Sequence, residues 1–275
     1  MPELPEVECL VRDLQNCLVG RKILDVKFFW ERMLSGFSSR EFCRQVSGRV
    51  VQKIQRKGKY ILIYLRAQKV LEIHLRMTGA LLFYPVDVQP GRHTGAVFYL
   101  GGKAALHFED MRKFGTFRLW DEQELPQTKP FLLGPDPLAK NFNCSRFHHL
   151  LALKPRGGIK SFLLNQENIS GLGNIYTDET LFRAGIHPAR KVGTLSREEE
   201  IALWEAMRRV LQEGIDLRGA SVSDYRDLQG KPGEFQNMLQ VYRRAGEKCP
   251  RCRGTIIRRV IAGRGTYLCP HCQLL

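Results

Sequence analysis

The stretch CPRCRGTIIRRVIAGRGTYLCPHC, residues 249–272, decides the fold of the C-terminal end of the chain. It holds two Cys-x-x-Cys pairs, and sixteen residues separate Cys252 from Cys269. Two such pairs at this distance supply four thiolates, which is the ligand set of a tetrahedral zinc site. Redox-active pairs are the alternative, but no βαβ pattern surrounds them. We therefore expect one structural zinc ion held by Cys249, Cys252, Cys269 and Cys272, although His271 could replace one ligand.

The residues between the two pairs predict a β-hairpin. Segments 255–261 and 266–268 would be its strands, with Gly263-Arg264-Gly265 at the tip. A zinc ion with four protein ligands has no open position for water, so it would shape the hairpin and leave catalysis to other residues. The hairpin is rich in basic side chains, which suit either a phosphate-facing surface or a plain solvated face. These are Lys248, Arg251, Arg253, Arg258, Arg259 and Arg264.

Upstream of this finger, the apolar pattern is helical. Apolar residues recur at helical spacing over 145–153, 160–166, 174–184 and 197–218. Residues 125–140 are rich in Pro and Lys and predict a linker, whereas 219–235 predict a long loop of the kind that is often functional. We expect a helical domain over 141–239, which includes this loop, and a zinc finger over 240–275.

The first 124 residues have a different rhythm. Residues 5–19 predict a helix, because apolar side chains recur at helical spacing between Pro5 and Gly20. After it come short apolar segments separated by Gly, Pro, Asp and Lys, which favour an antiparallel sandwich or barrel. These segments are 60–65, 70–75, 96–100, 105–108 and 116–120. The predicted fold class is α+β, with residues 1–124 as a β-sandwich domain preceded by a helix.

Composition restricts the possible partners. The 275 residues carry a net charge of +15, which favours a polyanionic partner such as nucleic acid. No segment has the length and apolarity of a membrane span, and the N-terminus has no secretory signal, so we expect an intracellular protein without a membrane partner. The other four cysteines are scattered singly, which fits a reducing compartment, and no role is assigned to them. They are Cys9, Cys17, Cys43 and Cys144.

The opening residues contain a possible nucleophile. When Met1 is removed, Pro2 becomes a free secondary amine, and such an amine can attack an aldehyde-like carbon to give an iminium. An α-amino group also titrates lower than a lysine, so more of it is neutral at physiological pH. The adjacent Glu3 could exchange a proton with the substrate. Taken alone, these residues also fit a simple rigid start to the helix.

Six motifs together resemble the formamidopyrimidine-DNA glycosylase family. They cover almost the whole chain in the family's order, and their combination is far more specific than any one of them. They are MPELPEVE (1–8), KGKY (57–60), HLRMTG (74–79), DMRKFG (110–115), LNQENISGLGNIYTDETLF (164–182) and AGRGT (262–266).

The resemblance implies a glycosylase that also cleaves the DNA strand. Pro2 would attack C1′ of the damaged nucleoside, and Glu3 would be the general acid that opens the sugar ring. Lys59 would donate a proton in β-elimination, and Arg264 would act in δ-elimination and bind phosphate. Glu6 would border the site as a possible lesion contact, or would instead only stabilise the helix N-terminus.

The resemblance also implies DNA contacts. Met77, Arg112 and Phe114 would fill the gap left by the extruded nucleotide, unless Met77 and Phe114 are strand core residues. The resemblance implies that the helical domain is a helix–two-turn–helix, in which Asn174 would grip a phosphate at a helix N-terminus. His74, His93, Arg156 and Lys160 are expected to help bind the backbone, and Thr78, Ser221, Ser223 and Tyr225 are possible lesion contacts.

The expected substrate is therefore damaged double-stranded DNA, bound by a monomer without a nucleotide cofactor. Oxidised purines are favoured, chiefly 8-oxoguanine opposite C and formamidopyrimidines. The endonuclease VIII branch, which acts on oxidised pyrimidines, usually has Gly where Leu4 stands and a reduced Met-Arg-Phe set. A non-enzymatic zinc-containing DNA-binding protein is the third reading, but Pro2, Glu3 and Lys59 are all retained.

Overall fold

A computed structural model describes all 275 residues, which form two compact units. The first unit comprises Met1–Leu132 and Leu217–Gln236, and the second comprises Leu133–Asp216 and Asn237–Leu275. Segment 217–236 thus belongs with the N-terminal unit, whereas the sequence pattern placed it in the helical domain. The physical reason is the burial of apolar side chains, because Tyr225 and Leu228 lie in the core of the first unit.

The first unit is an antiparallel β-sandwich that follows an N-terminal helix, as expected. Its two four-stranded sheets have the orders β1-β6-β7-β5 and β2-β3-β4-β8. The strands are β1 (Ile23–Phe28), β2 (Val51–Lys57), β3 (Tyr60–Leu65), β4 (Lys69–His74), β5 (Gly79–Tyr84), β6 (Thr94–Leu100), β7 (Ala105–Asp110) and β8 (Thr116–Asp121). The helices are α1 (Leu4–Leu18) and α2 (Ser39–Val46), with 3-10 turns η1 (Glu31–Met33), η2 (Glu122–Gln127) and η3 (Lys129–Leu132).

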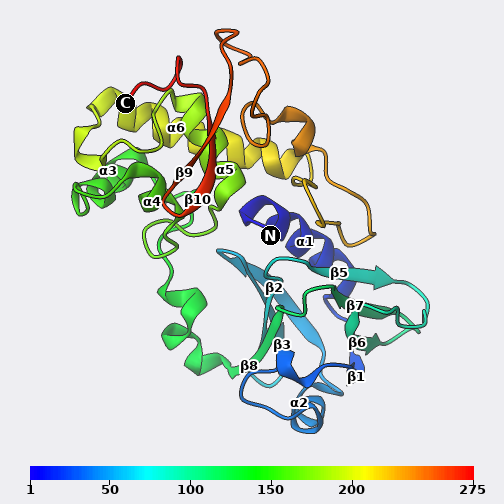
Figure 1. Cartoon of the computed structure of the whole chain (residues 1–275). Coiled ribbons are helices and arrows are strands. Elements are labelled where there is room, and N and C mark those ends of the chain that lie inside the picture. The colour runs from blue at the N-terminus through cyan, green and yellow to red at the C-terminus, as the bar shows by residue number, and fades with distance from the viewer. The chain divides into compact units, whose positions relative to one another are not determined.

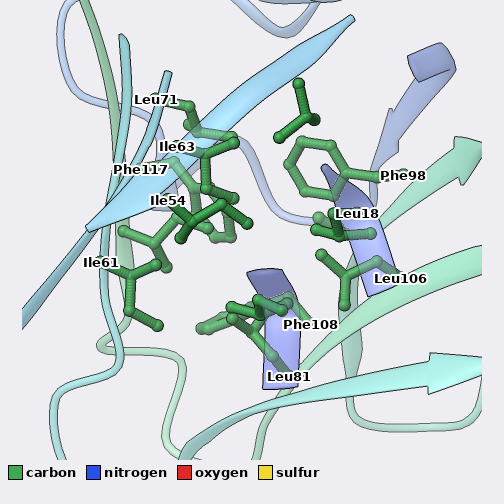
Figure 2. Close-up of a cluster of buried hydrophobic side chains, with 14 of the residues drawn as sticks. Leu18, Ile54, Ile61, Ile63, Leu71, Leu81, Phe98, Leu106, Phe108 and Phe117 are labelled. Carbon is green, nitrogen blue, oxygen red and sulfur yellow. The ribbon is translucent and has the colours of Figure 1, made fainter. Parts of the chain in front are cut away.

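The core of this unit lies between the two sheets (Figure 2). Ile54, Ile63 and Phe117 face it from one sheet, and Phe98 and Phe108 face it from the other. Burying a large apolar side chain stabilises the fold by about 1.5–3 kcal/mol, so this cluster dominates the stability of the unit.

Strand β3 is buried along its whole length because both of its faces are covered. The outward-facing Leu62 and Tyr64 pack with Leu125 and the partly buried Phe131. Residues 125–132, the first part of the predicted linker 125–140, therefore form part of the first unit.

Two connections cross from one sheet to the other at the same end of the sandwich. One runs from His74 at the end of β4 to Gly79 at the start of β5, and the other from Asp110 to Thr116. His74 pairs with Thr116 and Gly79 pairs with Asp110, so the two loops begin and end side by side. Tyr60 also pairs with His74, which places the β2–β3 turn at this end.

The second unit is helical and ends in a β-hairpin, which also confirms the expectation (Figure 1). Its elements are α3 (Cys144–Ala152), α4 (Ile159–Leu164), α5 (Asn174–Ala184), η4 (Val192–Thr194), α6 (Arg197–Asp216), β9 (Ile257–Ile261) and β10 (Arg264–Leu268). The turn η5 (Phe235–Met238) lies where the chain passes between units. None of the helices is long and apolar enough to span a lipid bilayer.

The hairpin tip differs from the expected Gly263-Arg264-Gly265. Ile261 pairs directly with Arg264, so the turn consists of Ala262 and Gly263, which have φ values of 54° and 67°. Two positive φ values in a row are what a tight two-residue hairpin turn requires. Arg264 is therefore the first residue of β10, and pairing holds its backbone.

Candidate active site and zinc centre

The start of α1 is rigid. Pro2 and Glu3 are both buried, and Glu3 is the N-cap of the helix. The Glu3 N–H donates to Glu6 Oε2 at 2.7 Å, and the Glu3 side chain accepts the Glu6 N–H, which completes a capping box. The backbone directly after Pro2 is thus held in one conformation.

Glu6 is fully engaged by the protein. It is 1% exposed, and its second carboxylate oxygen accepts the Ala220 N–H at 2.8 Å. The adjacent residue must be glycine. Gly219 has a φ of 86°, and a Cβ at this position would lie only 2.8 Å from Glu6 Cγ. Glu6 was expected to be a possible lesion contact. In the structure its carboxylate instead binds segment 217–236 to α1.

Lys59 lies in the two-residue turn between β2 and β3. Gly58 precedes it with a φ of 56°, a backbone conformation that is strained in residues with a Cβ. Arg56 connects this turn to α1, because its Nε donates to Glu8 Oε2 at 2.8 Å and its Nη1 donates to the Gly58 carbonyl at 3.2 Å. Burial opposes ionisation of Glu8, but Arg56 and Arg12 lower its pKa overall. A charged pair therefore holds Lys59 near the beginning of α1.

His74 lies beside this turn and is 8% exposed. Burial, with the nearby charges of Arg76 and Lys59, lowers the pKa of His74 to about 3. Its Nδ1 accepts the Arg76 N–H at 3.0 Å, so the ring is neutral with its proton on Nε2. His74 can donate a hydrogen bond to a phosphate, but it offers no positive charge.

Met77, Arg112 and Phe114 are on the two crossover loops and point into solvent. Met77 is 42% exposed and Phe114 is 50% exposed, so neither is a core residue. The Arg112 guanidinium lies 5.0 Å from the centroid of the Phe114 ring. His93 is also exposed at this end, where its carbonyl accepts the Asp110 N–H at 2.9 Å.

Asp110 organises both loops, and the sequence interpretation missed it. Its side chain is buried at 1% exposure. Oδ2 accepts the N–H groups of Phe114 and Gly115 at 2.7 and 2.8 Å, and Oδ1 accepts that of Arg112 at 3.1 Å and the Thr78 hydroxyl. Thr78 is thus tied to the opposite loop. An Asp at the end of a strand, directly before a short loop that ends in glycine, is the signal that could have revealed this role.

In the expected lesion-contact loop, the side chains of Ser221 and Tyr225 are engaged by the protein. The Ser221 hydroxyl donates to the Tyr225 carbonyl at 2.7 Å and accepts the Gly233 N–H at 2.9 Å. Tyr225 is 7% exposed and belongs to the sandwich core. Of the three side chains proposed there, Ser223 is the one that is exposed.

In the second unit, the structure brings Asn174 and the finger together. Asn174 opens α5 after Gly171, which has a φ of 92°, and its Nδ2 donates to the Gly265 carbonyl at 2.8 Å. Arg264 is exposed beside this contact, and Arg156 is exposed on the loop between α3 and α4.

Lys160 was expected to bind the DNA backbone, and this expectation is wrong for the structure observed. Its side chain is 0% exposed, and Nζ lies 2.6 Å from Asp178 Oδ1. A side chain that is fully buried and paired with a carboxylate offers no charge to a phosphate.

Four cysteine sulfurs form the zinc centre. Cys249, Cys252, Cys269 and Cys272 have all their Sγ atoms within 4.8 Å of one another. Cys249 and Cys272 lie 3.7 Å apart, and Cys252 and Cys269 lie 3.4 Å apart. Tetrahedral Zn–S bonds of about 2.3 Å place sulfurs roughly 3.8 Å apart, so the four thiolates fit a structural zinc ion. The exposed His271 is not needed as a ligand.

Three family models match the chain in consecutive order. Residues 1–117 match the formamidopyrimidine-DNA glycosylase N-terminal domain, and residues 133–226 match the H2TH domain of the same glycosylases. Residues 246–274 match a zinc finger found in FPG and IleRS.

Full-length relatives and solved structures agree with these matches. The formamidopyrimidine-DNA glycosylase of Carboxydothermus hydrogenoformans is 41% identical over 273 residues, covering 99% of this chain and 100% of that one. The Streptococcus pneumoniae enzyme of the same name is 39% identical, covering 99% of both chains. A Lactococcus lactis FPG mutant in complex with DNA containing Fapy-dG has a TM-score of 0.92 and 35% identity, with 100% of both chains covered.

Proposed function

Since this chain belongs to the formamidopyrimidine-DNA glycosylases, enzymes of base excision repair, we propose that it excises oxidised purines from duplex DNA and then cleaves the strand. The substrates are 8-oxoguanine opposite C and formamidopyrimidines. The solved complex of the Lactococcus lactis relative with Fapy-dG DNA supports this substrate class. The net charge of +15 also suits a polyanionic substrate.

The nucleophile is the amine of Pro2 after removal of Met1. Its lone pair attacks C1′ of the damaged nucleoside, the bond from C1′ to the base breaks, and the base leaves with the electron pair and takes up the proton that the Pro2 nitrogen loses. Glu3 protonates the ring oxygen as the sugar opens, which leaves an iminium between Pro2 and C1′. The capping box behind Pro2 supports this role, because it fixes the nucleophile without engaging its nitrogen.

Lys59 assists the first elimination. The iminium acidifies the proton on C2′, and loss of that proton expels the 3′ phosphate. The Arg56–Glu8 pair supports this assignment, because it holds the Lys59 turn beside the first part of α1. Arg264 then binds the 5′ phosphate and assists its loss in the second elimination.

Met77, Arg112 and Phe114 take the space of the extruded nucleotide. An aromatic ring and a flexible thioether can wedge between bases, and a guanidinium can bond the edge of the orphaned cytosine. Their exposure on two loops that share Asp110 supports this role, since water would otherwise surround such apolar groups.

The observation that carries the proposal is the arrangement at the start of α1. Buried Pro2 and Glu3 lie on the same helix end to which the Lys59 turn is tied by Arg56. A nucleophile, an acid and a second proton-transfer group are thus supplied by one rigid unit.

The test is cleavage of end-labelled duplexes that carry 8-oxoguanine opposite C, a formamidopyrimidine, an oxidised pyrimidine or a preformed abasic site. We expect the oxidised purines to be cut, leaving phosphates on both sides of the gap. Glu3→Gln should slow base excision at least roughly a hundredfold yet still cut the abasic site, where no base has to leave. Preference for oxidised pyrimidines would favour the endonuclease VIII branch, and binding without any cleavage would favour a non-enzymatic protein.

A further inference from the structure

A set of polar side chains is completely buried between α4, α5 and the zinc finger. Lys160, Asp178 and Thr266 are each 0% exposed. Lys160 Nζ lies 2.6 Å from Asp178 Oδ1 and 2.7 Å from Thr266 Oγ1. Taking charges out of water is costly even when they are paired, and an apolar set of the same shape often stabilises a fold as well or better. Stability alone is therefore a weak reason for this arrangement.

The direction of the hydrogen bonds in this set is fixed. An ammonium group can only donate, so Thr266 Oγ1 must accept from Lys160. The Thr266 hydroxyl proton is then free to donate to the Arg264 carbonyl, whose oxygen lies 3.0 Å away. A relay thus runs from the buried Lys160 to the backbone of Arg264.

Two further hydrogen bonds hold residues 264–267 of β10. Asp178 Oδ2 accepts the Tyr267 N–H at 2.9 Å, and Asn174 Nδ2 donates to the Gly265 carbonyl at 2.8 Å. The helical part of the unit therefore fixes the peptide groups on both sides of Thr266. Figure 1 shows the hairpin running alongside α5.

We propose that Lys160, Asp178 and Thr266 are positioning residues that set the backbone of Arg264 relative to Asn174. The inference rests on the proposed function, in which Arg264 assists the second elimination. The guanidinium of Arg264 is joined to the backbone by several rotatable bonds. The positions that it can reach therefore depend on where the backbone of Arg264 is held. Misplacing a reacting group by about 1 Å can cost a hundredfold in rate.

Thr266→Val is the sharpest test, because it removes the hydroxyl but keeps the shape and leaves the Lys160–Asp178 pair intact. Thr266→Ser restores the hydroxyl. Thr180→Val is the matched control: Thr180 is also 0% exposed on α5, and its Oγ1 has no hydrogen-bond partner. Lys160→Met is not used, because it would leave a buried carboxylate unpaired and could prevent folding.

The readout is the ratio of double-elimination to single-elimination product on a preformed abasic site, with zinc content and excision of 8-oxoguanine measured in parallel. Thr266→Val should lower the ratio roughly tenfold, because losing the equivalent of one hydrogen bond from transition-state stabilisation slows a step about tenfold. Excision of 8-oxoguanine should change less than about twofold. Thr266→Ser and Thr180→Val should match the wild type. An unchanged ratio in Thr266→Val, or an equal fall in Thr180→Val, would overturn the proposal.

Amide hydrogen exchange separates this inference from the proposed function. In the free, zinc-loaded protein, Thr266→Val should speed exchange of the Tyr267 amide, which donates to Asp178 Oδ2, and Thr180→Val should not. If the wild type fails to cut any abasic site but this exchange pattern appears, the chemistry is wrong and the positioning of β10 stands. If exchange is unchanged, the positioning role is wrong whatever the activity.

Discussion

The two units hold their candidate DNA-contacting residues in different ways. In the first unit, a large apolar core spans both sheets and α1, and the exposed Met77, Arg112 and Phe114 sit on loops above it. In the finger of the second unit, the apolar cluster is small and includes two of the zinc ligands, Cys249 and Cys269. There the order comes from a metal site and from buried charged groups.

The two regions also differ in what anchors the polypeptide backbone. A thick sandwich core can support loops with one buried carboxylate, Asp110, at its edge. The finger lacks such a core, so Asp178 and Glu179 hold its backbone from α5; Glu179 accepts the N–H groups of Val241 and Tyr242 at 2.9 Å each. Small modules commonly use metals or polar anchors where apolar burial is insufficient.

Loss of zinc should have the largest effect, and only on the second unit. Binding of structural zinc contributes roughly 10–16 kcal/mol to a folded finger, far more than its few buried side chains. Cys269→Ala should therefore abolish zinc binding, unfold residues 249–272 and weaken DNA binding. Hydrogen exchange of the sandwich amides should stay unchanged.

The control for this prediction is Cys17→Ala, which alters a free, half-buried cysteine in the first unit. It should retain zinc and duplex binding. A zinc-free Cys269→Ala protein with a normally protected finger would show that the two units do not differ as described.

Removal of Asp110 should have an intermediate effect, confined to the first unit. Asp110→Ala leaves the N–H groups of Phe114 and Gly115 without their acceptor, and should lower the free energy of unfolding by roughly 3 kcal/mol. It should also weaken binding to lesion DNA, because both loops lose their shared anchor. Urea denaturation measures the first effect and fluorescence anisotropy the second. Asp87→Ala, at an exposed position, should change stability by less than about 0.5 kcal/mol.

The smallest effect expected is a pH dependence that arises from His74. Its pKa is about 3 in the folded protein, against an ordinary value of 6.5, so the unfolded chain binds the proton first as the pH falls. Stability is therefore full above pH 6.5 and is lost as the pH falls toward 3. Between pH 7.5 and pH 5.5, wild type should lose about 1.4 kcal/mol relative to His74→Gln. Urea denaturation at each pH measures the free energy of unfolding of both proteins. An equal change in the two proteins across this range would show that His74 is not held neutral.

Periodicity predicted most of the fold, because apolar patterns report burial directly. Strand β3 and helix α5 begin and end where the sequence placed them. Strands β1, β2 and β5 were not singled out. The outer faces of β1 and β2 carry long polar side chains, such as those of Lys27 and Lys53, that interrupt the apolar pattern. Helix α2 was missed because it is short and mostly polar.

The candidate site was predictable only in part. The four zinc ligands follow from spacing, since the metal imposes it. Residue type does not reveal burial, however: Lys160 has the chemistry of a phosphate ligand, and the structure pairs it with Asp178. The same holds for Glu6 and Tyr225, whose partners lie more than 200 positions away in the sequence.

Borohydride trapping would show whether the Pro2 nitrogen is the nucleophile. The protein with Met1 removed would be mixed with a duplex containing 8-oxoguanine opposite C, reduced, digested and examined by mass spectrometry. We expect a covalent link between DNA and the nitrogen of Pro2, absent in Pro2→Gly and when Met1 is retained, and present in the control Pro5→Ala. A link at Lys59 or another lysine, or no link in a zinc-loaded protein that binds this duplex, would contradict it.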